Sequence, residues 1–210
     1  MMSKSHVCGH GRLQKHLKIF EQRSTLLAHH LIQLHNEILN FCQFIAPTPK
    51  ELEVREKVIK ELRQTVVSFW PTATVEVFGS QLTSILIPSS DIDVAVLNVP
   101  LKATETVADL IAELAVHIRK EIKVSYIEAV VNARVPIIKY DHLESGISVD
   151  ICINHDSGLR TGKFINDMMK VYPPLRPLTV VLKIFLVRKS LFSISIMLIS
   201  MNFLDTKENE

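Results

Sequence analysis

Apolar residues recur at helical spacing in four long segments of the chain. In the first segment they return every three or four positions, which is the period of one face of an α-helix. Ser24 is a plausible N-cap for that helix, and Pro47 and Pro49 separate it from the second helix, which Thr48 caps. The spacing predicts helices over residues 24–44, 49–69, 104–120 and 174–189.

Shorter segments rich in apolar and β-branched residues lie between these helices and predict strands. Between residues 91 and 96 acidic and apolar side chains alternate. Asp91 and Asp93 therefore lie on one face of a strand, while Ile92 and Val94 point into a core. The predicted strands are residues 75–78, 91–96, 124–131, 133–140 and 147–153.

Charged residues cover the outer face of the second predicted helix. Lys50, Glu51, Arg55 and Glu61 are among them. Such a face is usually solvated, so we expect these side chains to lie in water.

The composition is that of an ordinary globular protein. The chain has 210 residues, of which 47% are hydrophobic and 22% charged, enough for one domain or a domain and a half. The net charge of +2 neither establishes nor excludes a nucleic-acid partner, because a local basic patch would suffice. Three cysteines form no disulfide framework, which is typical of a reducing compartment.

Neither export nor membrane insertion is expected. The N-terminal residues lack the apolar segment of a signal peptide. The longest apolar run, residues 191–204, has 14 residues, whereas a bilayer span needs about 20.

The two acids of the second strand suggest chemistry on phosphates. Carboxylates side by side repel each other unless a cation lies between them, and oxygen-rich clusters suit Mg²⁺ or Mn²⁺ together with substrate phosphates. Gly79 and Ser80 offer backbone N–H groups and a hydroxyl to phosphate oxygens. A bare Asp-x-Asp pair could also line the solvent face of an edge strand. The glycine–serine turn and a third acid downstream favour phosphoryl or nucleotidyl transfer.

Residues 78–96, FGSQLTSILIPSSDIDVAV, resemble a motif of the nucleotidyltransferase superfamily that includes DNA polymerase β. Its signature is a strand-borne Gly-Ser, an acid–x–acid strand and one more acid on a neighbouring strand. The segment is more similar still to terminal nucleotidyltransferases of the nuclear RNA-surveillance poly(A) polymerase type, in which F-G-S-x-x-T-x-[LI]-x-x-P-x-S-D-I-D is typical. The resemblance extends, more weakly, from about Leu27 to Arg188.

Asp150 lies between Val149 and Ile151 in an otherwise apolar strand, where a charged side chain needs a partner. One interpretation pairs it with a local lysine or arginine. The resemblance instead implies that Asp150 is the third carboxylate of a metal site shared with Asp91 and Asp93.

The resemblance also implies nucleotide-binding residues. Gly79 and Ser80 would hold the phosphates. Asn154 matches the first position of a family pattern, N-x-x-x-G-[VL]-R-x-[AG], and would touch the ribose; a plain turn residue is the alternative. In a family helix L-x-x-x-L-K-x-F-L the lysine reaches the triphosphate. Lys183 takes that position, and a surface lysine among apolar neighbours is the alternative.

The match degrades after Lys189. The glycine-rich loop of the family is missing, and Ser193-Ile194-Ser195 stands where the family has a serine–tyrosine–serine element. In the family the base stacks on that tyrosine ring, and isoleucine has no π face. The segment that selects the base is also absent, so we expect an incomplete second domain.

The resemblance implies an α+β fold. It comprises a nucleotidyltransferase palm, with a mixed sheet of about five strands and flanking helices, and an incomplete helical second domain built from both chain ends. The expected parts are a flexible tail at 1–23, N-terminal helices of the helical domain at 24–70, the palm at 71–172 and the start of the truncated helical domain at 173–210.

We expect a template-independent RNA 3′-terminal nucleotidyltransferase, a poly(A) polymerase that adds AMP from ATP with Mg²⁺ or Mn²⁺. The resemblance implies RNA-binding or helicase subunits of a surveillance complex as partners, and the nucleus or the cytoplasm as the location. Three alternatives stay open. The palm could transfer UMP or modify a small molecule, the chain could be an inactive remnant that binds a partner protein, or it could fail to fold alone.

Overall fold

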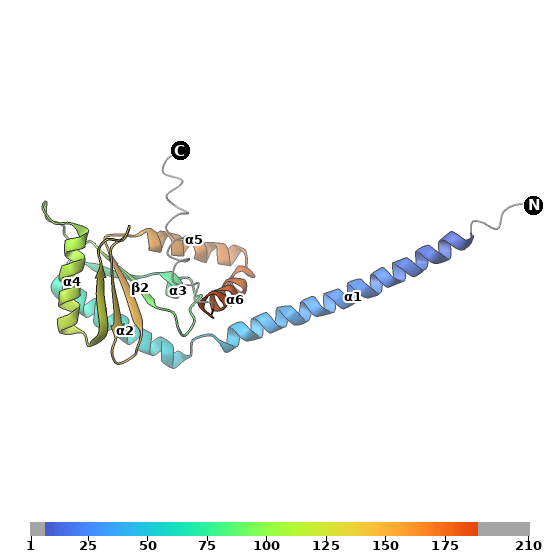
Figure 1. The fold of residues 1–210 in the computed structure, drawn as a ribbon, viewed down its shortest axis with the longest axis horizontal. Helices are drawn as coiled ribbons and strands as arrows, with labels where there is room; N and C mark the ends of the chain where they lie inside the picture. Colours follow the sequence, from blue (N-terminus) through green and yellow to red (C-terminus); the bar gives the residue numbers. More distant parts are fainter. Residues whose placement is uncertain (1–6, 189–210) are drawn as a thin grey trace, which may run out of the picture. The chain divides into compact units, whose positions relative to one another are not determined.

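The structure, a computed structural model, describes residues 7–188, and their side chains from residue 14 onward. The chain divides into two compact units, residues 1–44 and residues 45–210, each described by itself (Figure 1). The predictions for Ser193, Ile194 and Ser195 and for the apolar run 191–204 lie outside the described residues.

The described part of the first unit is one helix, α1 (Val7–Phe44). The sequence predicted a tail up to residue 23 and a helix start at Ser24, and this start was wrong. No proline interrupts residues 7–44, so nothing stops the helix, and Ser24 is an interior residue. Exposed apolar side chains of α1 include Leu17, Phe20, Leu27, Leu31 and Leu34.

The second unit is built on a mixed sheet. Its strands are β1 (Thr74–Val77), β2 (Ile92–Leu97), β3 (Val124–Val130), β4 (Ile137–His142) and β5 (Ser148–Ile153). They lie in the order β1-β2-β5-β4-β3, with β2 and β5 parallel and the other neighbours antiparallel. This five-stranded mixed sheet confirms the expected palm.

The largest error in a predicted strand boundary concerns the start of β4. β4 begins at Ile137, after Pro136, whereas the sequence predicted a start at residue 133. Proline has no N–H to donate to a ladder, so the strand starts only after it.

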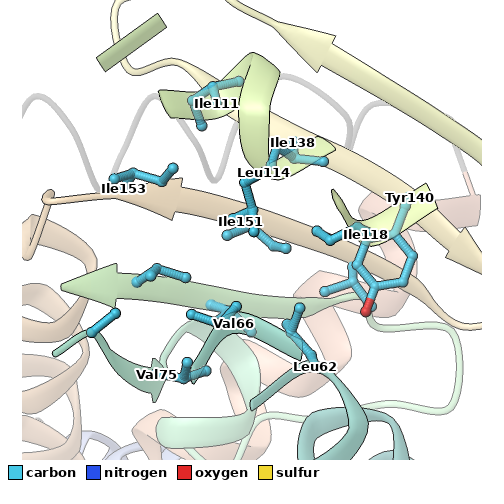
Figure 2. Packing of buried hydrophobic residues seen from close by; sticks show 14 of the residues in the cluster. Leu62, Val66, Val75, Ile111, Leu114, Ile118, Ile138, Tyr140, Ile151 and Ile153 are labelled. Atoms are coloured by element: carbon cyan, nitrogen blue, oxygen red, sulfur yellow. The ribbon is translucent and has the colours of Figure 1, made fainter. Parts of the chain in front are cut away.

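Helices flank the sheet. They are α2 (Pro49–Phe69), α3 (Gly79–Leu82), α4 (Val107–Glu121), α5 (Ser157–Val171) and α6 (Leu175–Arg188). Figure 2 shows how α2 and α4 cover one face. The labelled side chains from α2 and α4 are Leu62, Val66, Ile111, Leu114 and Ile118, and those from the sheet are Val75, Ile138, Tyr140, Ile151 and Ile153. The sequence led us to expect α2 in a helical domain; the observed α2 packs on the sheet, and the domain boundaries stay a prediction.

The opposite face of the sheet carries a smaller cluster. Ala95, Ile137 and Cys152 are buried there, and Leu159 of α5 packs against them. Because strand side chains alternate between faces, residues 93 and 150 also project to this side.

Local signals fix the helix starts. Thr48 caps α2 as predicted, and Glu51 completes a capping box, with a bond of 2.7 Å from the Thr48 N–H to the Glu51 carboxylate. Thr106 and Asp109 make the same arrangement at α4. α4 therefore starts at Val107 rather than at residue 104.

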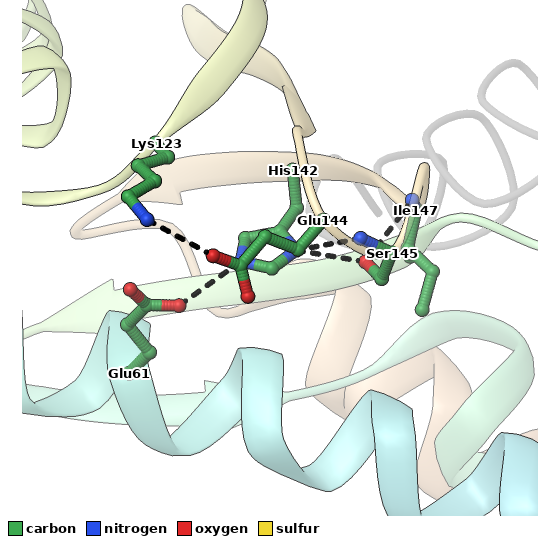
Figure 3. Close-up of polar contacts among 6 residues, drawn as sticks. All are labelled: Glu61, Lys123, His142, Glu144, Ser145 and Ile147. Atoms are coloured by element: carbon green, nitrogen blue, oxygen red, sulfur yellow. Dashed lines mark hydrogen bonds and ion pairs between the residues drawn. The ribbon is translucent and has the colours of Figure 1, made fainter.

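A buried histidine joins the turn between β4 and β5 to α2 (Figure 3). His142 Nε2 lies 3.0 Å from a Glu61 carboxylate oxygen, and Nδ1 lies 2.8 Å from the Ser145 hydroxyl. The Ser145 backbone N–H donates to Nδ1 at 3.2 Å, which assigns the ring hydrogen to Nε2. Beside it, Lys123 and Glu144 form a surface ion pair of 3.2 Å.

No helix within residues 7–188 combines the length and the apolar character needed to cross a bilayer.

Candidate active site

Two of the three predicted carboxylates are direct neighbours in the sheet. Asp93 on β2 pairs with Asp150 on β5 in the parallel register. Paired residues of parallel strands point to the same face, and the strands lie about 4.8 Å apart, so the two carboxylates project side by side. Asp91 lies two positions before Asp93, where the chain enters β2, and its charge interacts with that of Asp150. The structure thus pairs Asp93 with Asp150 directly and places Asp91 within range of their charges.

The pairing continues across the sheet as a row of charged residues. Lys139 on β4 pairs with Asp150, and Glu128 on β3 pairs with Lys139. We call this the charged row; its members are Asp93, Asp150, Lys139 and Glu128.

Gly79 lets the backbone that follows β1 approach Asp93. Its φ is +62°, in the left-handed region, and a Cβ at this position would lie 1.9 Å from Oδ2 of Asp93. Any larger residue would displace the carboxylate. The predicted glycine–serine turn therefore lies against the acids, with Ser80 in the single turn of α3.

The acids affect one another's protonation. Burial, together with the charges of Asp150 and Asp91, raises the pKa of Asp93 to about 7. Asp91 is exposed as a residue, yet desolvation of its carboxyl and the charge of Asp150 raise its pKa as well. Such mutual repulsion is typical of carboxylates that share a site.

Asp150 also has a lysine partner. Lys139 Nζ lies 2.6 Å from Asp150 Oδ2, so the local ion pair that the sequence left open is present. Burial lowers the pKa of Lys139, but the hydrogen bond to Asp150 and the charge of Asp150 outweigh it and raise the pKa.

The donor set fits a divalent cation. Carboxylate oxygens are the ligands that Mg²⁺ and Mn²⁺ prefer. Burial and then repulsion by Asp150 and Asp91 raise the pKa of Asp93, and a cation would relieve the repulsion. Among residues 7–188 no three His, Cys, Asp or Glu side chains converge tightly enough to form a ready metal site. The Asp150 carboxylate is hydrogen-bonded to the Lys139 ammonium.

Lys183 on α6 is bonded to the loop that precedes β2. Its Nζ donates to the Ser90 hydroxyl at 2.6 Å and to the Ile85 carbonyl at 3.4 Å, and only 4% of the residue is exposed. Burial lowers its pKa to about 8, while Asp93 and Asp91 oppose the shift. The surface-lysine alternative was therefore wrong. Contact with a triphosphate stays a prediction.

Arg55 lies in a place that the sequence did not lead us to expect. It was expected in water, but it is 2% exposed, and its Nη2 donates to the carbonyls of Pro88, at 3.1 Å, and Ser90. The charge of Arg55 also interacts with Asp91, which follows Ser90 in the chain. A signal was present, because Arg55 precedes the buried Ile59 by one helical turn and so lies on the buried stripe of α2.

Asn154 is the residue that directly follows β5, the strand that carries Asp150. Its φ is +52°, its side-chain oxygen accepts from the Val99 N–H at 3.0 Å, and its side-chain nitrogen donates to the Val99 carbonyl at 2.9 Å. These contacts account for Asn154 as a turn residue, the alternative left open by the sequence. A ribose contact stays a prediction.

α5 follows β5, and its first turn packs against Phe78, the residue before Gly79. A Cβ on Gly158 would lie 2.6 Å from the Phe78 ring, so this approach requires glycine. The first N–H groups of a helix and its dipole favour anions. An anion-favouring helix end therefore lies close to the glycine–serine turn.

The family model described as "Poly(A) RNA polymerase, mitochondrial-like, central palm domain" matches residues 34–170. The matched range contains all five strands and the three acids.

Curated relatives carry related names. The chain is 36% identical over 157 residues to poly(A) RNA polymerase cid14 of Schizosaccharomyces pombe, and 37% identical over 150 residues to poly(A) RNA polymerase protein 2 of Saccharomyces cerevisiae. These matches cover 75% and 71% of this chain but 23% and 25% of the relatives, so the chain spans about a quarter of their length. A third relative, 32% identical over 160 residues (74% of this chain and 38% of the relative), is the inactive poly(A) RNA polymerase protein Trf4-2 of Drosophila melanogaster.

Solved structures share the fold. The polymerase core of TRAMP, an RNA surveillance complex, has 35% identity and a TM-score of 0.64, over 73% of this chain and 47% of that one. The GLD-2/RNP-8 complex has a TM-score of 0.65 at 20% identity, over 74% and 49% of the two chains, and supports the fold alone.

Proposed function

This chain belongs to the family of the poly(A) RNA polymerase, mitochondrial-like, central palm domain, and we propose that it is a template-independent nucleotidyltransferase that adds AMP from ATP to RNA 3′ ends. The observation that carries the proposal is the direct pairing of Asp93 with Asp150 beside Gly79. The names of the relatives supply the choice of reaction. The activity of the whole relatives is part of the proposal, since the chain spans only a fraction of their length.

In this proposal Asp91, Asp93 and Asp150 hold Mg²⁺ or Mn²⁺. When bound, such ions lower the pKa of the RNA 3′-hydroxyl and neutralise charge on the phosphates. Asp91 and Asp93 would be ligands of the ions, and Asp150 would complete the set for the ion that activates the RNA hydroxyl. Because Asp93 and Asp150 are on paired strands, their spacing is fixed before any substrate arrives.

The same proposal assigns the nucleotide phosphates to the side of the acids opposite the RNA hydroxyl. Gly79 and Ser80 would bind the β- and γ-phosphates through the turn that starts α3. Lys183 would add positive charge from α6, and its interaction with Asp93 and Asp91 supports this placement. Asn154 would touch the ribose in the same proposal.

The test is extension of a labelled oligo(A) by the purified chain with ATP and Mg²⁺ or Mn²⁺. Asp93→Ala should abolish extension, because the cation loses a ligand. Asp167→Ala is the matched control, since Asp167 is an exposed carboxylate paired with Lys170 on α5. No extension by the wild type, or undiminished extension by Asp93→Ala, would contradict the proposal.

The same assay separates AMP from UMP transfer. Each of the four nucleotides is supplied at the same concentration to the same primer, and the primer should be extended best with ATP. Preferential extension with UTP would replace the proposal with uridylyl transfer by the same palm.

A second candidate is an impaired family member that acts by binding. It is favoured by one observation, the 32% identical relative that is named as inactive. This candidate predicts ATP binding without turnover and a stable complex with another protein. Equilibrium binding of ATP beside a negative extension assay would support it.

The proposal also names the setting. RNA 3′ ends and ATP are the substrates, and RNA-binding or helicase subunits are the partners, by analogy with the similar polymerase core of TRAMP, an RNA surveillance complex. We place the protein in the nucleus, and localisation of the tagged full chain by microscopy tests this placement.

A further inference from the structure

Lys139 is a cation beside the acid cluster, by which we mean Asp91, Asp93 and Asp150. We propose that it acts as the counter-ion of the three carboxylates and competes with a divalent cation for Asp150. The inference rests on the proposed function, because it concerns the same metal site. It makes Lys139 a positioning residue that sets how tightly the site binds metal.

Lys139 occupies an interior place in the charged row. It lies between Asp150 on one side and Glu128 on the other, and it is the only cation of that row. Residues directly opposite in antiparallel strands have Cβ atoms about 5 Å apart, so Lys139 reaches either acid without moving the backbone.

The ammonium of Lys139 is bonded to the cluster. Its Nζ donates to Asp150 Oδ2 at 2.6 Å, and the Asp150 side chain is only 21% exposed. This ion pair joins Lys139 directly to a member of the acid cluster. Two other cations lie near the acids. Arg55 donates to the Pro88 and Ser90 carbonyls, Lys183 donates to the Ser90 hydroxyl, and the charges of both interact with Asp91.

The Lys139 ammonium also has a second carboxylate partner within reach. A divalent cation that binds Asp150 must share its carboxylate with Lys139 or displace it. Glu128 offers a second carboxylate at the next position of the charged row, on the side away from Asp93. The Lys139 side chain is 42% exposed, so it has room to turn.

Lys139 therefore has two opposite effects, one on the stability of the free protein and one on cation binding. Without a bound cation, Lys139 offsets the repulsion among Asp91, Asp93 and Asp150 and stabilises the fold. During cation binding the same positive charge opposes the incoming ion. A substitution that removes the charge should therefore tighten metal binding while it destabilises the free protein.

The experiment measures Mn²⁺ binding to the full chain by electron paramagnetic resonance of free Mn²⁺, without nucleotide or RNA. We expect Lys139→Met to bind Mn²⁺ about tenfold more tightly than the wild type, the effect of one charge on a neighbouring carboxylate. Lys139→Arg keeps the charge and should bind no more tightly than the wild type. Lys123→Met removes a lysine from the surface pair with Glu144 and should leave the affinity unchanged.

A second readout is the melting temperature with EDTA and with saturating Mn²⁺. Lys139→Met should melt below the wild type in EDTA and gain more from Mn²⁺. Unchanged or weaker Mn²⁺ binding by Lys139→Met, with binding by the wild type intact, overturns the inference and leaves the proposed function standing. Absence of Mn²⁺ binding by the wild type removes the metal site itself, and the inference with it.

Discussion

Gly79 and Asp93 share a space that admits no further atom. The backbone of Gly79 is left-handed, and the Asp93 carboxylate lies where a side chain at residue 79 would start. Both conditions exclude other residues, one through backbone strain and one through steric overlap. The position of the carboxylate therefore depends on a residue that has no functional group.

A substitution at Gly79 separates these two effects. We expect Gly79→Ala to lower the free energy of unfolding by about 2–4 kcal/mol, because it adds a clash with Asp93 to the backbone strain. Urea denaturation measures the change. Gly146→Ala is the control: Gly146 has a φ of +66°, but a Cβ there would meet no atom within 4 Å, so only the strain of about 1 kcal/mol applies. Equal losses in the two variants would show that the overlap with Asp93 is unimportant.

The raised pKa of Asp93 makes stability depend on pH. Its pKa is about 7 in the fold against an ordinary value of 3.8, so the folded state binds the proton more tightly and loses stability as pH rises from about 4 to 7. Asn carries no such charge. In EDTA we expect Asp93→Asn to be more stable than the wild type by roughly 1–3 kcal/mol at pH 8 and to show a smaller gain at pH 5. Thermal melts across this range test it, and a gain that does not change with pH would contradict the assignment.

At the scale of elements, α2 supports the entrance to β2. Arg55 crosses from the buried stripe of α2 to the carbonyls of Pro88 and Ser90, immediately before Asp91. Lys183 of α6 bonds to the side chain of the same serine. Two helices far apart in the sequence thus hold one loop in place.

Removal of the Arg55 side-chain charge should be costly. Arg55→Met leaves buried carbonyl oxygens without their donor, and we expect a loss of about 2–4 kcal/mol in the free energy of unfolding. Lys57→Met, two positions along the same helix, removes an exposed lysine paired with Glu53 and should change stability by less than about 0.5 kcal/mol. Urea melts compare the two. Similar values would mean that Arg55 does not anchor the loop.

Local patterns predicted the elements better than their contacts. Thr48 and the alternation around Asp93 were sufficient to place the start of α2 and the strand that carries the acids. Arg55 was misplaced because its charge was weighed above its position one turn before Ile59. The pairing of Asp93 with Asp150 depends on the tertiary order of the strands, which no local pattern contains; the resemblance, and not the spacing, singled out Asp150.

For the whole molecule, the core of the second unit is assembled without α1. Its buried apolar cluster draws on residues from Val58 to Ile153, all after α1. Within the described residues, the charged row and its neighbours also belong to this unit.

A chain that starts at Ile45 should therefore keep its fold. We expect residues 45–210 to unfold cooperatively, with a midpoint close to that of the full chain, because no member of the main core cluster is removed. Circular dichroism at 222 nm during heating tests this. Loss of the cooperative transition would show that α1 contributes to the core.

The parallel register of β2 and β5 has a consequence for how the molecule avoids wrong structures. A slip of β5 by a single residue would exchange its two faces, turning Asp150 toward the cluster of Val94, Val96 and Ile138 and bringing Ile151 out beside Asp93. A bare carboxylate in that interior is strongly disfavoured. Burial of the Asp150 charge therefore disfavours the misaligned sheet, so the residue proposed for catalysis also helps to specify the register of the strands.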